Sequence, residues 1–358
     1  MKATAALHAS GQSIWLDNIT RDLLDSGTLA RYVQELSVTG LTSNPTIFDH
    51  AIGHSKAYDA DIQKLAAQGK SGDDLFFDLA IADLRRAAAL FRPVFDRTAT
   101  VDGYVSLEVS PLLAYDTGKT IASAKALHAR AACDNLMIKI PGTQEGLPAI
   151  EEAIFAGVPV NVTLLFAREH YVAAADAYMR GLERRIEAGL SPDVRSVASL
   201  FVSRWDRATA DKVPPELAHR LGIAVARQCY KAYRDLLESD RWQRLEGQGA
   251  RPQRLLMAST STKDKSAPDT LYVAALAAAN TVDTMPEETL LALADHGPAP
   301  SIIPRDGGDA EEILARLNRI GIQTGPLAAQ LQDEGAKSFV KSWESLMDAV
   351  TKKSRVLA

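Results

Sequence analysis

Residues 136–143 read Leu-Met-Ile-Lys-Ile-Pro-Gly-Thr, an apolar strand-like run that contains one lysine. A buried ammonium is costly unless it is paired or loses its proton, so Lys139 is an anomaly in such a run. A desolvated lysine amine is also what Schiff-base chemistry on a carbonyl requires. The run ends at Pro-Gly, so Lys139 stands near the carboxyl end of a strand, where parallel barrels build their active sites. The alternative is a lysine on an edge strand whose ammonium reaches water.

Similar short apolar runs recur along the chain and alternate with helical patterns. We expect strands at residues 13–17, 38–43, 104–109, 136–140, 158–164, 194–202, 254–258 and 281–285. Eight strands that alternate with helices favour an α/β fold, a (β/α)8 TIM barrel with extra helices. A doubly wound open sheet is the alternative. The residues after the first strand, Asp-Asn-Ile-Thr at 17–20, lack the glycine-rich turn which that fold would use.

We expect residues 1–358 to form a single barrel domain with a C-terminal helical extension. Residues 297–330 begin with a stretch rich in Pro, Gly and Asp and are expected to be a loop-rich insertion. Residues 331–352 are expected to form a C-terminal helix, because an apolar stripe recurs there at helical spacing. The stripe consists of Phe339, Trp343, Met347 and Val350. It could pack on the barrel wall or cover part of the barrel mouth.

Composition and charge argue against several classes of partner. The chain is 46% hydrophobic and 24% charged, as is typical of globular proteins, and its net charge is −5. It has no basic stripe with interleaved aromatic residues, so we expect no nucleic acid partner. No apolar run approaches the roughly 20 residues of a membrane span, and the N-terminus lacks the pattern of a signal peptide. The two cysteines have no metal-ligand spacing and fit a cytoplasmic protein.

Polar residues stand in or just after six consecutive predicted strands. They are Asp17, Asn44, Glu108, Lys139, then Asn161 with Thr163, and finally Ser199 with Ser203 and Arg204. Any one of these could be a turn former, a helix cap or a satisfied core group, and for Asp17 or Asn44 alone the cap is favoured. Six successive strands with this feature instead favour an active site at one mouth of a barrel.

Together these segments resemble the successive motifs of the transaldolase family. The matching segments are Asp17, Thr-Ser-Asn-Pro-Thr at 42–46, Ser-Leu-Glu-Val-Ser at 106–110, Ile-Lys-Ile-Pro-Gly-Thr at 138–143, Asn-Val-Thr-Leu-Leu-Phe at 161–166 and Ser-Leu-Phe-Val-Ser-Arg at 199–204. The set is specific, although no single motif is. The most similar form is the longer variant related to transaldolase/glucose-6-phosphate isomerase fusions, here without the second domain.

The resemblance implies a class I transferase that needs no metal or cofactor. It would move a dihydroxyacetone unit from fructose 6-phosphate or sedoheptulose 7-phosphate to erythrose 4-phosphate or glyceraldehyde 3-phosphate, in the non-oxidative pentose phosphate pathway. Lys139 would form the Schiff base, which acts as the electron sink for C–C cleavage. Asp17 would be the acid and base of that cleavage. Glu108 and Thr163 would hold a catalytic water.

The resemblance also implies how the sugar phosphate is bound. Asn44 and Asn161 would bind the dihydroxyacetone hydroxyls. Ser199 and Arg204 would lie at the phosphate end, where a guanidinium suits a dianion.

The seventh predicted strand departs from the family pattern. Many members carry an arginine there for the phosphate, whereas this chain reads Met-Ala-Ser-Thr-Ser-Thr-Lys at 257–263. We expect Ser259 and Lys263, or hydroxyls with backbone amides, to take the place of that arginine.

Two other functions are compatible with the same scaffold. One is a simple aldolase that releases free dihydroxyacetone. The other is a non-catalytic sugar-phosphate-binding protein, which would be expected to lack the lysine or a carboxylate. His50 and His54 have a spacing that could suit a metal, but no third ligand is near them in sequence. We expect a monomer or a weak homodimer.

Overall fold

A computed structural model describes residues 2–357 of the chain. In this range eight parallel strands pair in sequence order and close into a barrel. The strands are β1 (Ser13–Asp17), β2 (Val38–Thr42), β3 (Val105–Glu108), β4 (Leu136–Pro141), β5 (Val160–Leu165), β6 (Ser196–Phe201), β7 (Gln253–Ala258) and β8 (Val282–Met285). Each strand falls on one of the apolar runs of the sequence, which confirms the predicted (β/α)8 barrel and excludes the open sheet.

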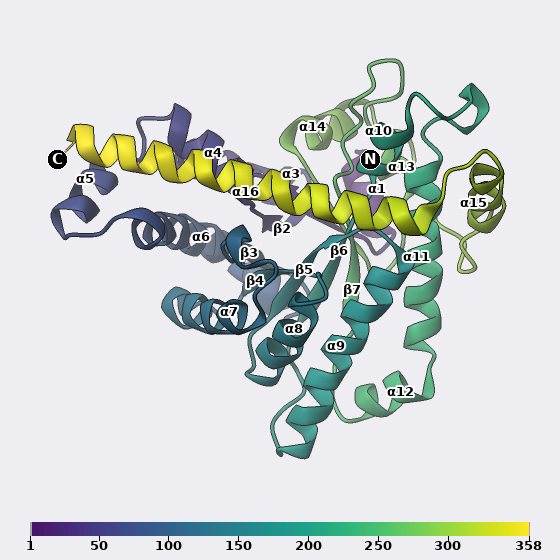
Figure 1. Cartoon of the computed structure of the whole chain (residues 1–358), viewed down its shortest axis with the longest axis horizontal. Coiled ribbons are helices and arrows are strands. Elements are labelled where there is room, and N and C mark those ends of the chain that lie inside the picture. Colours follow the sequence, from purple (N-terminus) through teal and green to yellow (C-terminus); the bar gives the residue numbers. More distant parts are fainter. Residues whose placement is uncertain (1, 358) are drawn as a thin grey trace.

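Helices surround the barrel on its outside (Figure 1). Those up to β5 are α1 (Ala3–Ala9), α2 (Arg21–Asp25), α3 (Thr28–Glu35), α4 (Pro45–His54), α5 (Asp59–Ala67), α6 (Gly72–Arg97), the 3-10 turn η1 (Pro111–Leu113), α7 (Thr117–Ala131) and α8 (Gly146–Phe155). Those after β5 are α9 (Arg168–Glu187), α10 (Ser203–Thr209), the 3-10 turn η2 (Pro215–Leu217), α11 (Leu221–Leu237), α12 (Asp240–Gly247), α13 (Leu271–Ala275), α14 (Glu287–His296), α15 (Ala310–Arg319) and α16 (Thr324–Leu357).

One indole fills the lower interior of the barrel and sets the floor of the site above it. Alternate residues of a strand share a face, so Ser13, Trp15 and Asp17 of β1 all point inward. Trp15 is fully buried and donates from Nε1 to Oδ1 of Asp102 at 2.8 Å. A side chain at Gly40 of β2 would meet the indole, because a Cβ there would lie 2.5 Å from Nε1. Asp17 therefore stands one layer above a tightly packed floor.

The segment between β8 and the last helix is more helical than its composition indicates. Residues 297–330 include α15 and the first turns of α16. α15 packs against α11 on the outside of the barrel. The last helix begins at Thr324 and extends to Leu357, so it is longer at both ends than the expected range 331–352.

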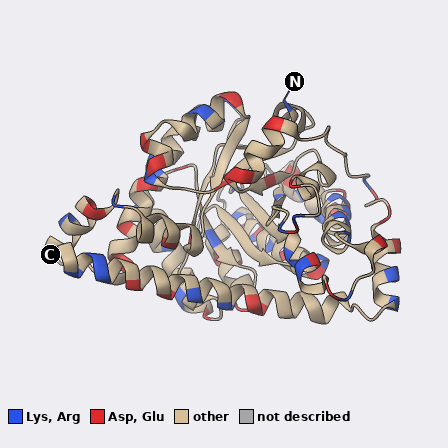
Figure 2. Cartoon of the chain, turned by 90° about the horizontal axis from the view of Figure 1, so that it is seen from above, with Lys and Arg blue, Asp and Glu red and all other residues tan. Residues whose placement is uncertain are grey.

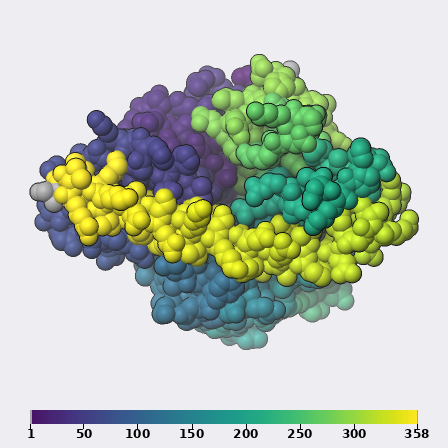
Figure 3. All heavy atoms as spheres, turned by 45° about the horizontal axis from the view of Figure 1, so that its top comes forward, coloured from purple at the N-terminus to yellow at the C-terminus, as the bar shows by residue number. Residues whose placement is uncertain are grey.

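α16 is a single helix of 34 residues that runs across the molecule (Figure 1). In the space-filling view of Figure 3 it forms a continuous yellow ridge. Its first half crosses the barrel end, because Gln332 Nε2 donates to the carbonyls of Gly142 at 3.1 Å and Leu164 at 2.9 Å. Its second half packs on α4, α5 and α6. There the ring of Trp343 lies 5.2 Å from that of Phe76. The apolar stripe thus meets both the barrel mouth and the surrounding helices.

Charged residues of both signs are interspersed over the outer helices, α16 included (Figure 2). Among the described residues, no helix is both long enough and apolar enough to cross a membrane.

Candidate active site

Lys139 is paired inside the barrel. Its Nζ lies 3.1 Å from Oε2 of Glu108, and only 6% and 2% of the two side chains are exposed. Nζ also donates to the carbonyl of Ser43 at 3.1 Å. Strand register places Lys139 opposite Glu108 on β3 and opposite Asn161 on β5. Because a closed barrel has no edge strand, the alternative of an edge lysine that reaches water is excluded.

Glu108 and Thr163 carry buried oxygen atoms with few partners. The ion pair of Oε2 with Lys139 is the interaction of the Glu108 carboxylate, and the hydroxyl of Thr163 forms no hydrogen bond with any described residue. Burial raises the pKa of the Glu108 carboxyl above its ordinary value, and the adjacent Lys139 charge offsets this only in part. Since buried polar groups normally have partners, these atoms are suited to bind a water molecule or a substrate atom.

Asp17 faces Lys139 at the end of a chain of hydroxyls. The hydroxyl of Thr42 donates to Oδ1 of Asp17 at 2.7 Å. The hydroxyl of Thr284 lies 2.7 Å from that of Thr42. Because Thr42 has already used its only hydroxyl proton, Thr284 is the donor to Thr42. Burial raises the pKa of the Asp17 carboxyl above its ordinary value. The positive charge of Lys139 and, to a smaller extent, the hydrogen bond from Thr42 lower this pKa and offset part of the rise. Asp17 does not cap α2, because Thr20 does so by accepting from the backbone N–H of Leu23.

Asn161 is held in one orientation from both sides. Its amide nitrogen donates to Oγ of Ser106 at 3.1 Å, and its amide oxygen accepts from Oγ of Ser199 at 2.7 Å. Ser199 was expected to lie at the phosphate end with Arg204. Its hydroxyl instead faces Asn161, because Ser199 is an inward residue of β6, whereas Arg204 lies beyond that strand on α10.

Asn44 is both a helix cap and a mouth residue. Its side-chain oxygen accepts from the backbone N–H of Ile47 at 3.0 Å, which makes Asn44 the N-cap of α4. The cap leaves the amide nitrogen of Asn44 available to other groups. The helix-cap interpretation and a substrate contact are therefore compatible.

Arg204 lies at the far side of the mouth between aromatic rings. Its Cζ is 4.9 Å from the ring centroid of Phe201 and 5.9 Å from that of Phe339. The same Phe339 ring lies 5.9 Å from Nζ of Lys139. The two cations thus face one ring of α16, with Lys139 inside the barrel and Arg204 outside it.

Ser259 and Lys263 follow β7 on the same side as Arg204. The Ser259 hydroxyl is 2.9 Å from that of Ser203. The ammonium of Lys263 is exposed and lies 3.3 Å from Oε1 of Glu288. Lys263 therefore already has a carboxylate partner.

Gln332 and Gly335 of α16, with Thr42 and Thr284, belong to the site but were not predicted from the sequence, which named Phe339 only as part of the apolar stripe. Gly335 lies close to Leu164 and Arg204, since a Cβ at this position would lie 3.0 Å from Cδ2 of Leu164 and 3.2 Å from Nη1 of Arg204. Gln332 and Phe339 hold the helix over the barrel end, as described above. The sequence signal for the α16 residues was the apolar stripe, and the signal for Thr42 was its place in the motif at 42–46.

We found no group of three or more His, Cys, Asp or Glu residues that could hold a metal ion within residues 2–357. His50 and His54 are stacked on each other, with ring centroids 5.0 Å apart.

Comparison with known proteins identifies relatives over the whole chain. The family model described as Transaldolase/Fructose-6-phosphate aldolase matches residues 14–350. A transaldolase of Parafrankia sp. (strain EAN1pec) is 44% identical, over 98% of this chain and 97% of that protein. A transaldolase of Thermobifida fusca is 45% identical over 96% of both chains. Transaldolase 2 of Nostoc sp. (strain PCC 7120) is 39% identical over 97% of this chain and 96% of that protein.

Proposed function

The chain belongs to the transaldolase/fructose-6-phosphate aldolase family and is a transaldolase, and on that premise we propose how its residues perform the reaction. The enzyme transfers a dihydroxyacetone unit from fructose 6-phosphate or sedoheptulose 7-phosphate to erythrose 4-phosphate or glyceraldehyde 3-phosphate. The transfer proceeds through an imine on Lys139. The observation that carries the proposal is the buried Lys139 amine, which lies 3.1 Å from the Glu108 carboxylate and whose charge also acts on the Asp17 carboxyl.

Imine formation begins with the Lys139 amine and the C2 carbonyl of the donor. The amine must first release a proton, and Glu108 at 3.1 Å is the nearest acceptor. Attack on C2 gives a carbinolamine, which loses its hydroxyl as water and leaves the protonated imine. We assign Glu108 and Thr163 to the water that relays these protons, because the buried Thr163 hydroxyl has no partner among the described residues and the Glu108 carboxylate is paired there with Lys139 alone.

Cleavage of the C3–C4 bond follows. Asp17 accepts the proton of the C4 hydroxyl, the bond electrons flow into the imine, and an aldose phosphate leaves. The three-carbon enamine then attacks the aldehyde of the acceptor, and Asp17 returns the proton to the new hydroxyl. Burial raises the pKa of Asp17, which suits a carboxyl that must both take and give a proton. Hydrolysis of the new imine frees the product and Lys139.

The remaining polar residues bind the two ends of the sugar phosphate. Asn161 and Asn44 bind the dihydroxyacetone hydroxyls, and Ser199 fixes the amide of Asn161 through its hydrogen bond. Arg204 binds the phosphate, with Ser259 and Lys263 on the loop after β7.

We also propose that the enzyme works without a metal or an organic cofactor, because the imine itself is the electron sink. We further infer a cytoplasmic location and a monomer or weak homodimer. Residues 1–358 form one folding domain in this proposal, supported by the many contacts of α16 with α4, α5 and α6.

One assay separates this proposal from a simple aldolase and from a binding protein. Fructose 6-phosphate is supplied with and without erythrose 4-phosphate, and both glyceraldehyde 3-phosphate and free dihydroxyacetone are measured. A transferase releases glyceraldehyde 3-phosphate in amounts that depend on the acceptor. Release of equal amounts of dihydroxyacetone and glyceraldehyde 3-phosphate without acceptor would indicate an aldolase. No turnover and no borohydride-trapped adduct would indicate a binding protein.

A further inference from the structure

The chain lacks the arginine that many family members carry in the seventh-strand motif, here residues 257–263, and a pocket beside Arg204 indicates what replaces it. A cavity of about 540 Å³ lies between α10 and the loop after β7. The polar residues that line it include Ser203, Arg204, Arg207, His219, Ser259 and Lys263. Arg207 was not among the residues expected at the site.

Arg204 and Arg207 are three positions apart on α10 and therefore neighbours on one helix face. Within residues 2–357, neither guanidinium has a hydrogen-bond or ion-pair partner at contact distance. Burial lowers the pKa of Arg204, and the positive charge of Arg207 lowers it further. The acid that acts most on Arg204 is Glu334 of α16, which is exposed and accepts from the side chain of Gln330. Two like charges that face one cavity favour an anion between them.

The other charged groups of the cavity already have partners. The Asp206 carboxylate accepts from the backbone N–H groups of Leu221 and Gly222 and from the hydroxyl of Tyr272.

Asp264 pairs with Nε2 of His219 at 3.2 Å. The ammonium of Lys263 lies 3.3 Å from Oε1 of Glu288, and the Lys263 side chain is largely exposed. The two arginines, the buried Thr262 hydroxyl, which has no partner among the described residues, and the Ser203–Ser259 hydroxyl pair are thus the groups left to bind a ligand.

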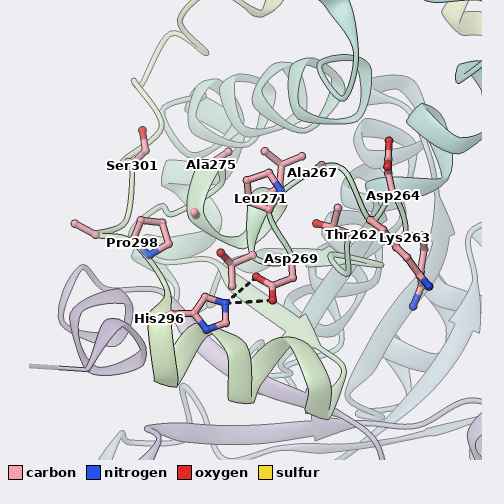
Figure 4. A pocket seen from close by; sticks show the side chains of 15 residues that line it. Thr262, Lys263, Asp264, Ala267, Asp269, Leu271, Ala275, His296, Pro298 and Ser301 are labelled. Carbon is pink, nitrogen blue, oxygen red and sulfur yellow. Dashed lines mark hydrogen bonds and ion pairs between the residues drawn. The ribbon is translucent and has the colours of Figure 1, made fainter. Parts of the chain in front are cut away.

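The neighbouring pocket offers a contrast. It is larger, about 870 Å³, and shares Thr262, Lys263 and Asp264 with the first. Figure 4 shows that Asp269 and His296 contact each other at its wall. Nε2 of His296 lies 3.1 Å from Oδ1 of Asp269. None of its described lining residues is an arginine. A dianion is therefore better matched to the smaller pocket.

We propose that Arg207 is the second cation of the phosphate site and that it determines the preference for phosphorylated substrates in place of the arginine absent from the seventh-strand motif. This inference rests on the proposed function of the barrel mouth. Arg204 holds the phosphate from the barrel side and Arg207 from the solvent side, with Ser259 between them as a hydroxyl ligand. Lys263 contributes less, since its side chain is largely exposed and its ammonium lies 3.3 Å from the Glu288 carboxylate.

The test compares Arg207→Ala, Arg207→Lys and Lys263→Ala with a control, Arg251→Ala. Arg251 is exposed and precedes β7, so it lies at the opposite end of that strand from the pocket. Its replacement by alanine removes one positive charge, as Arg207→Ala does, but away from the pocket. Transfer from fructose 6-phosphate is measured with erythrose 4-phosphate and with unphosphorylated erythrose as acceptors. Inhibition by inorganic phosphate is measured in the same assay.

In Arg207→Ala we expect KM for erythrose 4-phosphate and the inhibition constant of phosphate to rise about tenfold, equivalent to about 1.4 kcal/mol. KM for erythrose should stay within about twofold of the parent value, Arg207→Lys should recover part of the loss, and Lys263→Ala should change less than Arg207→Ala. An unchanged KM for erythrose 4-phosphate would overturn the proposal, as would an equal rise for both acceptors. If the parent protein transfers no dihydroxyacetone, the proposed function itself fails. In that case, calorimetric titration with inorganic phosphate tests whether Arg207 binds phosphate in the pocket. Equal phosphate affinity in the parent and in Arg207→Ala would refute this role, and about tenfold weaker binding by Arg207→Ala would support it.

Discussion

Oε2 of Glu108 lies 3.1 Å from Nζ of Lys139, and both side chains are almost completely buried in the barrel. An ion pair in such a place is maintained by mutual neutralisation, because either charge alone would be strongly disfavoured. Burial also raises the pKa of Glu108, so its carboxyl is prepared to take the proton that Lys139 must lose before it attacks a carbonyl. The ion pair that offsets the cost of burying the two charges thus also places the Lys139 amine in contact with a proton acceptor.

Replacing Lys139 with methionine tests the assignment of the imine. The change keeps the length and apolar character of the side chain but removes the amine, so no Schiff base can form. We expect borohydride in the presence of fructose 6-phosphate to add no mass to Lys139→Met, and turnover to fall by several orders of magnitude. Mass spectrometry of the parent should place a three-carbon adduct on the peptide that contains Lys139. An adduct of equal yield on a different lysine would refute the assignment.

Replacing Asp17 with asparagine tests the proton transfer that accompanies C–C cleavage. Asparagine keeps the shape and can still accept from Thr42, but it cannot take up the C4 hydroxyl proton. An acid/base group of this kind contributes about 10²–10⁴-fold to the rate. The variant should form the imine and then stall, so the adduct trapped with borohydride should retain six carbons. Thr42→Val is the matched control, because it removes only the hydroxyl that donates to Asp17 and should slow cleavage less. Near-parental transfer by Asp17→Asn would mean that another group, first Glu108, is the base.

The barrel and the strand-end residues were accessible from the sequence because their signals are local. Lys139 stands out as one lysine in an apolar run, and the strands are short apolar segments bounded by turns. Thr42 and Thr284 were missed, because their hydrogen bond joins residues that are 242 positions apart. Nothing in the local pattern of either strand indicates that partner.

The role of α16 was less accessible for a related reason. Helical spacing reveals that Phe339 is on an apolar face, but not which part of the molecule that face covers. The bond from Gln332 to Leu164 spans 168 positions. The direction in which the last helix returns across the barrel is decided by such contacts. The close approach of Gly335 to Leu164 and Arg204 is likewise evident only once those residues are placed beside it.

Phe339 is expected to keep water from the three-carbon enamine. Its ring is the wall that α16 presents to Lys139, and it is almost fully buried. Phe339→Leu shortens that wall, so protonation of the enamine by water should compete better with transfer to the acceptor. We expect the ratio of free dihydroxyacetone to transferred product to rise several-fold. The control is Met347→Ala, which removes an apolar side chain from the same helix at a position distant from both cations. A change in ratio of the same size in the control would show that the effect comes from loosening α16 as a whole.

Asp283 is expected to make the stability of the protein depend on pH. It is fully buried on β8 and accepts only from the hydroxyl of Thr260, at 2.9 Å, while its second carboxylate oxygen has no partner among the described residues. Burial raises its pKa to about 7. The hydroxyl of Thr260 also lies 3.1 Å from the carbonyl of Thr284, which can only accept. If protonated Asp283 donates to the Thr260 hydroxyl, that hydroxyl is free to donate to the Thr284 carbonyl.

The sign of the effect follows from the raised pKa. Below about pH 4 the carboxyl is protonated in both the folded and the unfolded chain, and its burial costs nothing extra. Between pH 4 and pH 7 the unfolded chain loses this proton while the folded protein keeps it, so stability falls as pH rises, by up to about 4 kcal/mol, and then levels off. Asp283→Asn does not titrate. Its free energy of unfolding relative to the parent should therefore increase from pH 4 to pH 8, as measured by urea denaturation at each pH. Asp211→Asn, at an exposed position, is the control and should track the parent. If the difference between Asp283→Asn and the parent is the same at pH 4 and pH 8, Asp283 does not retain its proton in the folded protein.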